Sequence, residues 1–191
     1  MTEKFKGKYR IKSTRLQSWD YSRNGAYFIT ICTHDKEHYL GKIVNYEMEL
    51  SHIGVLANAM WYEIKNHAKN IKLGKFVIMP NHVHGILILN ADNQNRVDGA
   101  PVLSPKKSIG SQRFQNQGKN TISSIVGSYK SAVTKHARRL GYKFAWQSRF
   151  HDHIIRNQES FNRITEYINT NPKIWEKDKF YTPMQPIEQR F

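Results

Sequence analysis

Residues 79–88 are Met79-Pro80-Asn81-His82-Val83-His84-Gly85-Ile86-Leu87-Ile88. Alternate residues of a β-strand point to the same face of a sheet, about 6.6 Å apart along the chain. The stretch therefore predicts a strand over 82–89, with His82 and His84 on one face and Val83 in the core. Two imidazoles at this spacing can bind one metal ion, although two ligands alone complete no site and the pair could lie on a solvated face. The flanking Pro80-Asn81 and the basic chain favour the metal site.

The segments on either side of this stretch predict a fold of strands and helices. Pro80-Asn81 joins the histidine strand to another strand over 75–79. The other predicted elements are strands over 26–34 and 144–156, a hairpin-like stretch over 38–50, and helices over 53–69, 121–140 and about 158–171. This order predicts an α+β fold, a ferredoxin-like (RRM-like) antiparallel sheet with helices on one face and an added C-terminal helix.

The composition predicts one globular domain with a polyanionic partner. The chain has 191 residues, of which 39% are hydrophobic, and this suits a single domain over 1–191. Its 30 Lys and Arg outnumber 15 Asp and Glu, which gives a formal net charge of +15. Such an excess favours nucleic acid first and an anionic membrane second. Because the basic residues are spread along the chain instead of flanking one apolar stripe, we expect nucleic acid and no membrane.

Two segments and one cysteine bear on location and cofactors. Residues about 1–25 form a basic N-terminal extension, and about 91–120 predict an exposed basic loop rich in Asn, Gln, Ser, Gly and Lys. The single cysteine, Cys32, excludes an intramolecular disulfide framework and a four-cysteine zinc site. The N-terminus has no apolar signal core and no segment is long enough to cross a bilayer, so we expect a cytoplasmic protein.

A second pair of histidines, His151 and His153, also occupies alternate positions of a predicted strand. The residue between them is Asp152, so the opposite face gains a charge instead of a core anchor. We therefore favour a structural role, or hydrogen bonds that orient ligands of the first pair. His151 and His153 remain the rival metal site.

The last predicted helix contains Tyr167, which borders an apolar stripe formed by Phe161, Ile164 and Ile168. Asn171 follows one helical turn later on the same side. Taken alone, Tyr167 fits an ordinary half-buried aromatic residue. Asn171, directly before Pro172, fits an N-cap of a new helical turn.

Taken together, these segments resemble the IS200/IS605-like single-tyrosine transposases, and most closely their REP-associated branch. The resemblance covers nearly the whole chain. It is carried by the strand over 25–33, the His-hydrophobic-His segment over 76–84, Ser128-Tyr129-Lys130-Ser131, and Tyr167-Ile168 followed by Asn171-Pro172 and Trp175.

The resemblance implies a role for each matching position. His82, His84 and Asn171 would be ligands of a divalent metal, Mg²⁺ or Mn²⁺, and Tyr167 would be the nucleophile. The protein would cleave and rejoin single-stranded DNA near hairpins through a 5′-phosphotyrosine intermediate. The bond energy stays in that intermediate, so strands can be rejoined without ATP.

The positive charge predicts which residues contact the DNA. Phosphates would contact Lys130, Lys135, Arg138, Arg139 and the basic N-terminal run that ends at Arg15. Trp19, Tyr21 or Trp146 could stack on unpaired bases. The alternative for each residue is an ordinary charged surface or an aromatic in the core.

Other functions also fit parts of the pattern. The main alternative is a non-catalytic ferredoxin-like nucleic-acid-binding module, and a second is a rolling-circle-type initiator that uses the same chemistry. A metal-dependent hydrolase would use the two histidines but would not need Tyr167. The resemblance allows a monomer or a homodimer, and the loop and the N-terminal extension favour the monomer.

Overall fold

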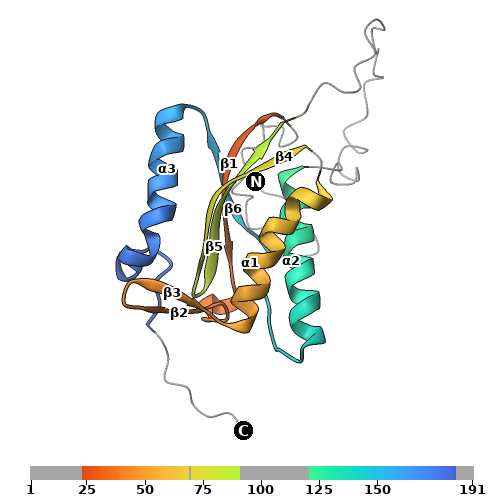
Figure 1. Cartoon of the computed structure of the whole chain (residues 1–191), viewed down its shortest axis with the longest axis vertical. Helices are drawn as coiled ribbons and strands as arrows, with labels where there is room; N and C mark the ends of the chain where they lie inside the picture. The colour runs from red at the N-terminus through yellow and green to blue at the C-terminus, as the bar shows by residue number, and fades with distance from the viewer. Residues whose placement is uncertain (1–22, 69, 91–120, 184–191) are drawn as a thin grey trace, which may run out of the picture.

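The computed structural model describes residues 23–68, 70–90 and 121–183, and these form an antiparallel sheet with helices on both faces (Figure 1). The sheet has four strands in the order β4-β5-β1-β6. Its strands are β1 (Gly25–Cys32), β4 (Ile71–Met79), β5 (His82–Leu89) and β6 (His151–Ile155), and its helices are α1 (His52–His67), α2 (Ile122–Arg139) and α3 (Gln158–Thr170). The predicted α+β fold class is thereby confirmed.

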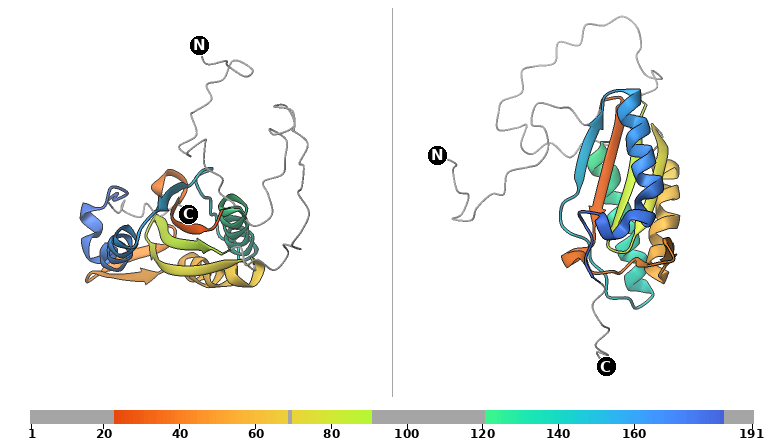
Figure 2. Two further views of the ribbon diagram at one scale, coloured as in Figure 1. Left: turned by 90° about the horizontal axis from the view of Figure 1, so that it is seen from above. Right: turned by 90° about the vertical axis from the view of Figure 1, so that its left-hand side faces the viewer.

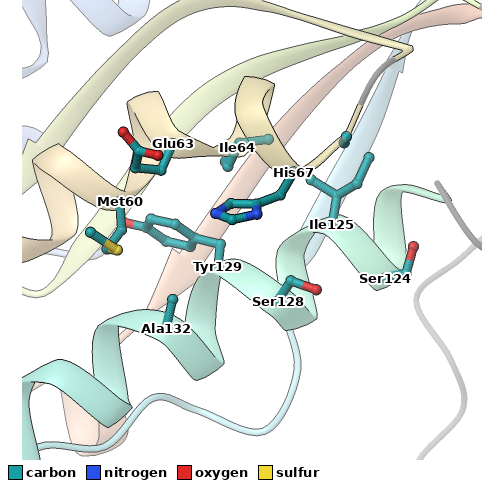
Figure 3. Close-up of a pocket in the computed structure, with 10 residues that line it drawn as sticks. Met60, Glu63, Ile64, His67, Ser124, Ile125, Ser128, Tyr129 and Ala132 are labelled. Carbon is teal, nitrogen blue, oxygen red and sulfur yellow. The ribbon is translucent and has the colours of Figure 1, made fainter.

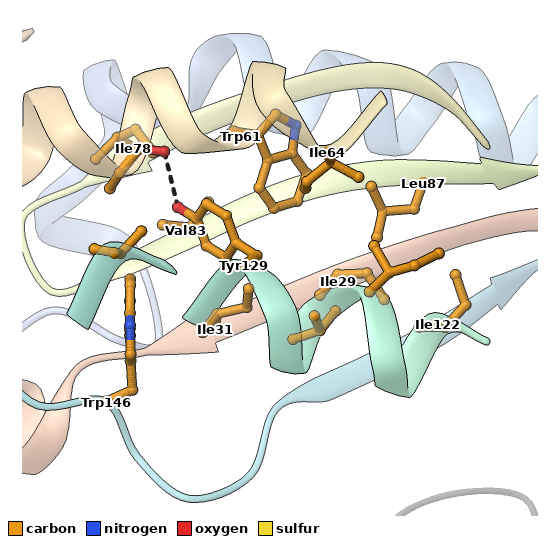
Figure 4. Packing of buried hydrophobic residues seen from close by; sticks show 14 of the residues in the cluster. Ile29, Ile31, Trp61, Ile64, Ile78, Val83, Leu87, Ile122, Tyr129 and Trp146 are labelled. Atoms are coloured by element: carbon orange, nitrogen blue, oxygen red, sulfur yellow. Dashed lines mark hydrogen bonds between the residues drawn. The ribbon is translucent and has the colours of Figure 1, made fainter. Parts of the chain in front are cut away.

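The two faces of the sheet carry different side chains because residues alternate along each strand. Tyr27, Ile29 and Ile31 of β1 join Val83 and Leu87 of β5 in the main core, under α1 and α2. Figure 4 shows this core, in which Tyr129 of α2 and Trp61 of α1 pack together. The hydroxyl group of Tyr129 donates a hydrogen bond to Ala57 O (3.0 Å), which satisfies the polar end of a fully buried ring.

The helix α3 covers the opposite face of the sheet (Figures 1 and 2). Its Ile164 and Ile168 pack against Ile86 of β5 and Ile155 of β6 in a second, smaller core. The structure therefore has α1 and α2 on one face, as predicted, and places the added C-terminal helix on the other. His82 and His84 alternate with Val83 on β5, so they face the α3 side.

A short hairpin stands apart from the main sheet. The predicted stretch over 38–50 contains β2 (Gly41–Val44) and β3 (Glu47–Leu50), which pair with each other in a two-stranded sheet. Asn45 and Tyr46 connect them with φ of 50° and 66°. Two successive positive φ values are typical of a type I′ turn, whose twist matches that of a hairpin.

The bounds of two predicted strands differ from the structure. The strand β4 begins at Ile71 instead of residue 75, and its pairing with β5 shifts between Leu73 and Phe76. A predicted strand over 144–156 is reduced to β6, preceded by one isolated bridge between Thr33 and Trp146. The predicted loop over 91–120 and most of the N-terminal extension lie outside the described residues. Among the described helices, none combines the length and apolar character needed to cross a membrane.

The close approach of α1 to the sheet predicts the effect of one substitution. A Cβ added at Gly85 would overlap the indole ring of Trp61 and lie 3.0 Å from Cβ of Phe76. We expect Gly85→Ala to lower the free energy of unfolding by about 1–3 kcal/mol, as overpacking a core does. Urea denaturation followed by circular dichroism measures this change.

The control is Gly127→Ala in α2, where an added Cβ meets nothing within 4 Å. Alanine has the higher helix propensity, so this variant should gain about 0.5–1 kcal/mol. Equal midpoints for the two variants would contradict the packing of Trp61 against Gly85.

Candidate metal and tyrosine site

His82 and His84 begin strand β5 and lie buried beneath α3. They are 0% and 1% exposed, and their ring centroids are 4.3 Å apart. The turn Pro80-Asn81 starts the strand at a point where both imidazoles face the same side. The two side chains can therefore present nitrogen atoms to one point.

The side chain of Asn81 fixes the orientation of His82. The amide nitrogen Nδ2 of Asn81 donates hydrogen bonds to Phe180 O (2.9 Å) and Lys36 O (3.2 Å), which turns Oδ1 toward His82. His82 Nδ1 lies 2.9 Å from that oxygen and must donate to it. The other nitrogen, Nε2, is thereby left without a proton, and it is buried with no hydrogen-bond partner. An imidazole held through Nδ1 with a free Nε2 is the arrangement found in metal-bound histidines.

His84 contacts both a threonine and the predicted nucleophile. Its Nδ1 lies 2.9 Å from Oγ1 of Thr30, the neighbouring residue on β1. Its Nε2 lies 3.1 Å from the hydroxyl group of Tyr167. Because the single proton of the Tyr167 hydroxyl group is donated to Asp178, His84 Nε2 donates to Tyr167 and His84 Nδ1 accepts from Thr30. The hydroxyl group of Thr30 can also accept a hydrogen bond, so it allows the other tautomer, with Nε2 unprotonated, that a metal ion at Nε2 would require.

Tyr167 and Asn171 both converge on a carboxylate that the sequence analysis missed. The hydroxyl group of Tyr167 donates to Asp178 Oδ2 (2.6 Å), and Asn171 Nδ2 donates to the same oxygen (2.7 Å). The backbone N–H of Phe180 donates to Asp178 Oδ1 (2.7 Å). Asp178 follows the 3₁₀ helix over Asn171–Lys177 and is 8% exposed.

Asn171 is not a helix N-cap. It is fully buried in the right-handed helical conformation, and the cap residue of the following 3₁₀ helix is Thr170. The side-chain oxygen of Asn171 is buried without a hydrogen-bond partner. The capping alternative is therefore wrong, and one amide oxygen at the site is free.

Asp178 and the two histidines form a group that could hold a metal ion. One donor atom from each of the three residues lies within 4.8 Å of the other two. In the part of the chain that the structure describes, this is the one group of three His, Cys, Asp or Glu side chains with such spacing. The lone pair of His82 Nε2 and the free oxygen of Asn171 fit a cation at this position.

Burial keeps the two histidines neutral, whereas hydrogen bonds keep Asp178 ionised. Burial, with the nearby charges of Lys179 and Lys36, lowers the pKa of His82 to about 3. Burial also lowers the pKa of His84, so both imidazoles are neutral at pH 7, as metal ligands must be. Burial raises the pKa of Asp178, but hydrogen bonds from Tyr167, Phe180 and Asn171 outweigh it and hold that pKa below its usual value.

The Tyr167 hydroxyl group is protonated in this arrangement. Burial raises its pKa, and the hydrogen bond that it donates to Asp178 raises it further. The ring of Tyr167 also packs edge-on against Phe28 of β1, with centroids 6.1 Å apart. Its position is fixed, but the phenol must lose a proton before it can act as a nucleophile.

The second histidine pair lies on the same face but outside this group. His151 pairs with Thr30 across β1 and β6, and His153 pairs with Phe28, so both point to the α3 side. Both are exposed. His151 approaches the site through Phe180, whose ring centroid is 6.2 Å away.

The basic residues of α2 border an open groove. Lys130, Lys135 and Arg138 line a hollow of about 590 Å³ with residues 145–148, whereas Arg139 is exposed outside it. The ammonium group of Lys130 donates hydrogen bonds to Gln147 O (2.6 Å) and Ser148 O (3.2 Å), so it also holds this segment against α2. Arg15, Trp19 and Tyr21 lie outside the described residues.

Trp146 belongs to the core instead of a base-stacking surface. It is 9% exposed and packs edge-on against Phe144, with ring centroids 4.8 Å apart.

A second cavity, of about 400 Å³, lies between α1 and α2 and is lined by Met60, His67 and Ser128 among others (Figure 3). None of the residues proposed for chemistry lines this cavity.

Comparisons with known proteins place the chain in a family. No protein-family model matches it. A Haemophilus influenzae protein, described as uncharacterized, is 36% identical over 183 residues, which is 95% of this chain and 99% of that protein. A solved structure of a REP-associated tyrosine transposase bound to a REP hairpin is 19% identical, with a TM-score of 0.56 over 88% of this chain and 77% of its own. The chain therefore belongs to the same family as the Haemophilus influenzae protein and has the fold of a single-tyrosine transposase.

Proposed function

We propose that this protein is a metal-dependent transposase that cleaves and rejoins single-stranded DNA near hairpins. The observation that carries the proposal is the contact between Tyr167 and His84. A phenol oxygen 3.1 Å from His84 Nε2, beside a second histidine and a carboxylate, brings a nucleophile and a metal-binding group together. The similarity to a solved transposase bound to a hairpin supports the same reading.

The residues present fit a divalent cation, Mg²⁺ or Mn²⁺. His82 and His84 would hold it, and Asn171 would offer its free side-chain oxygen. Imidazole and oxygen ligands together suit Mn²⁺, and oxygen ligands suit Mg²⁺. When bound, such an ion neutralises charge on the scissile phosphate.

The protein residues supply the nucleophile and the path of its proton. The proton of Tyr167 already points at Asp178 Oδ2, so this carboxylate accepts it as the phenol oxygen attacks phosphorus. The bond from phosphorus to the 3′ oxygen breaks, and that oxygen leaves as a hydroxyl group after taking up a proton. A 5′-phosphotyrosine remains on Tyr167, and attack by a 3′-hydroxyl group reverses the step.

The basic residues of the groove beside α2 bind the DNA. Lys135 and Arg138 are exposed, line the groove and make no hydrogen bond to its carbonyl groups, unlike Lys130. We infer that they contact phosphates of a DNA hairpin, with Arg139 beside them and Arg15 of the N-terminal run as a further contact. His84 and Tyr167 meet within one chain, so the site needs no second copy, and this supports a monomer.

The non-catalytic binding module remains the second candidate, because one observation favours it. His82 is fully buried and His84 is 1% exposed, so neither imidazole is open to a phosphate in this conformation. A protein that kept the fold and the basic groove would bind hairpins without cutting them. Covalent attachment of DNA separates the two functions.

Covalent attachment of DNA is expected to require Tyr167. Incubated with a labelled single-stranded hairpin library and Mn²⁺, the wild-type protein should form a protein–DNA adduct that survives denaturation. Tyr167→Phe should form none, because it lacks the nucleophilic oxygen, and yet should bind hairpins as tightly as wild type. The readout is a labelled band on a denaturing gel.

Tyr181→Phe is the matched control, since Tyr181 is a half-exposed tyrosine three residues beyond Asp178. It should form the adduct at the wild-type level. An adduct that persists in Tyr167→Phe would show that the nucleophile is misassigned, and tight binding without any adduct would favour the non-catalytic module.

A divalent metal ion bound at the histidines is expected to stabilise the folded protein. Saturation with Mn²⁺ at 100 times its dissociation constant should stabilise the folded protein by about 2.7 kcal/mol, which raises the melting temperature by several degrees. His84→Ala should abolish the rise because it removes a ligand. His153→Ala removes an exposed histidine of the second pair and should keep the rise. Loss of the rise in His153→Ala alone would move the site to the second pair.

The basic residues of the groove are expected to set part of the salt dependence of DNA binding. The double variant Lys135→Ala, Arg138→Ala should bind a hairpin more weakly and reduce the slope of log affinity against log salt by roughly 1.4–1.8 for two lost phosphate contacts. Lys72→Ala removes an exposed lysine from β4, at the opposite edge of the sheet from β6, and should leave the slope unchanged. Titrations at several salt concentrations measure both slopes, and equal slopes would exclude the groove as the DNA contact.

A further inference from the structure

We propose that Asp178 is a third protein ligand of the ion held by His82 and His84. This inference rests on the proposed function, because it requires a metal at the two histidines. It assigns a role in metal binding to a residue that the resemblance to the transposases did not single out.

The geometry places a carboxylate beside the two imidazoles. Donor atoms of His82, His84 and Asp178 all lie within 4.8 Å of one another, and all three residues are buried. The nitrogen Nε2 of His82 is buried and its lone pair has no hydrogen-bond partner. A cation between the three donors would satisfy it.

The carboxylate has room for one more interaction. An ionised carboxylate offers about four lone-pair sites. Tyr167 and Asn171 use two of them on Oδ2, and the N–H of Phe180 uses one on Oδ1. The three hydrogen bonds come from neutral groups, so they orient the carboxylate and leave its negative charge uncompensated. One lone pair of the carboxylate is therefore left for a cation.

The charge of the surroundings favours a negative ligand. The ammonium group of Lys179 lies over the ring of Phe180, 4.8 Å from its centroid, and that ring packs against His82. Two neutral imidazoles and an amide would bring no negative charge to a divalent cation in this field. Asp178 supplies it, in a chain whose formal net charge is +15.

The segment that carries Asp178 is held in place independently of any ion. Asn81 Nδ2 donates to Phe180 O (2.9 Å), and the hydroxyl group of Thr182 lies 2.9 Å from His38 Nε2. Asp178 is thus fixed between α3 and the turn before β5. Because Oδ2 accepts the proton of Tyr167, the same carboxylate would connect the metal to the nucleophile.

The test compares Mn²⁺ affinity among three full-length proteins by electron paramagnetic resonance of the free ion. Asp178→Asn should weaken binding by about tenfold or more, because loss of a ligand should cost at least as much as loss of a supporting hydrogen bond. Asp35→Asn makes the same change at an exposed aspartate and should match wild type. Circular dichroism without metal checks that each variant is folded.

A cysteine variant tests whether the side chain of residue 178 binds the metal directly or only contributes a nearby charge. Asp178→Cys places a soft thiolate at the same position, which favours Cd²⁺ over Mn²⁺. With Cd²⁺ it should show the ultraviolet thiolate-to-cadmium charge-transfer band. Wild type, whose single cysteine is Cys32, gives the background.

The results distinguish failure of the role of Asp178 from failure of the whole metal site. Affinity of Asp178→Asn within twofold of wild type, or no cadmium band in Asp178→Cys, overturns the role of Asp178. If His82→Ala also binds Mn²⁺ like wild type, no metal binds at the histidines, and the proposed function loses its metal site together with this inference. If His82→Ala loses Mn²⁺ while Asp178→Asn keeps it, the metal site stands and Asp178 alone is excluded.

Discussion

The site depends on the side-chain amide of one buried residue, Asn81. Its oxygen accepts the hydrogen bond of His82 Nδ1, and its nitrogen holds the backbone of Lys36 and Phe180. A buried amide left unsatisfied costs about 1–3 kcal/mol, so these three connections maintain one another. The turn before β5, the protonation of the first histidine and the position of the segment after α3 are therefore set together. No other described side chain joins all three.

Much of the fold follows from patterns within single segments. The alternation of His82, Val83 and His84 predicts both the strand β5, whose bounds agree with the structure, and the shared face of the two histidines. The helices α1 and α2 begin within a residue of their predicted starts because Ser51 and Thr121 cap them. The start of β4 was missed because Gly74 and Lys75 interrupt the pattern where the pairing shifts. A local irregularity of this kind leaves no periodic signal.

The parts of the site that were missed depend on contacts between distant segments. Asp178 lies in the run Glu176-Lys177-Asp178-Lys179, which by composition resembles a solvated surface. Only the packing of this segment under Asn81 and Asn171 buries it. Asn171 before Pro172 fits a helix N-cap equally well on sequence, and its helical conformation and unpartnered side-chain oxygen exclude that alternative. Trp146 resembles an exposed aromatic in a basic segment until Phe144 and Tyr129 enclose it.

The two faces of the sheet bury unequal cores, and this has a consequence for motion. The larger core joins the sheet to α1 and α2, whereas α3 rests on a few isoleucines and on Phe28 and Phe161. Free energies of local opening follow the apolar contacts that a segment makes, so α3 should open at a lower free energy than α1 and α2. Its amide protons would exchange with solvent before those of β1 and β5. The helix that carries Tyr167 can therefore detach and return while the strand that carries the histidines stays folded.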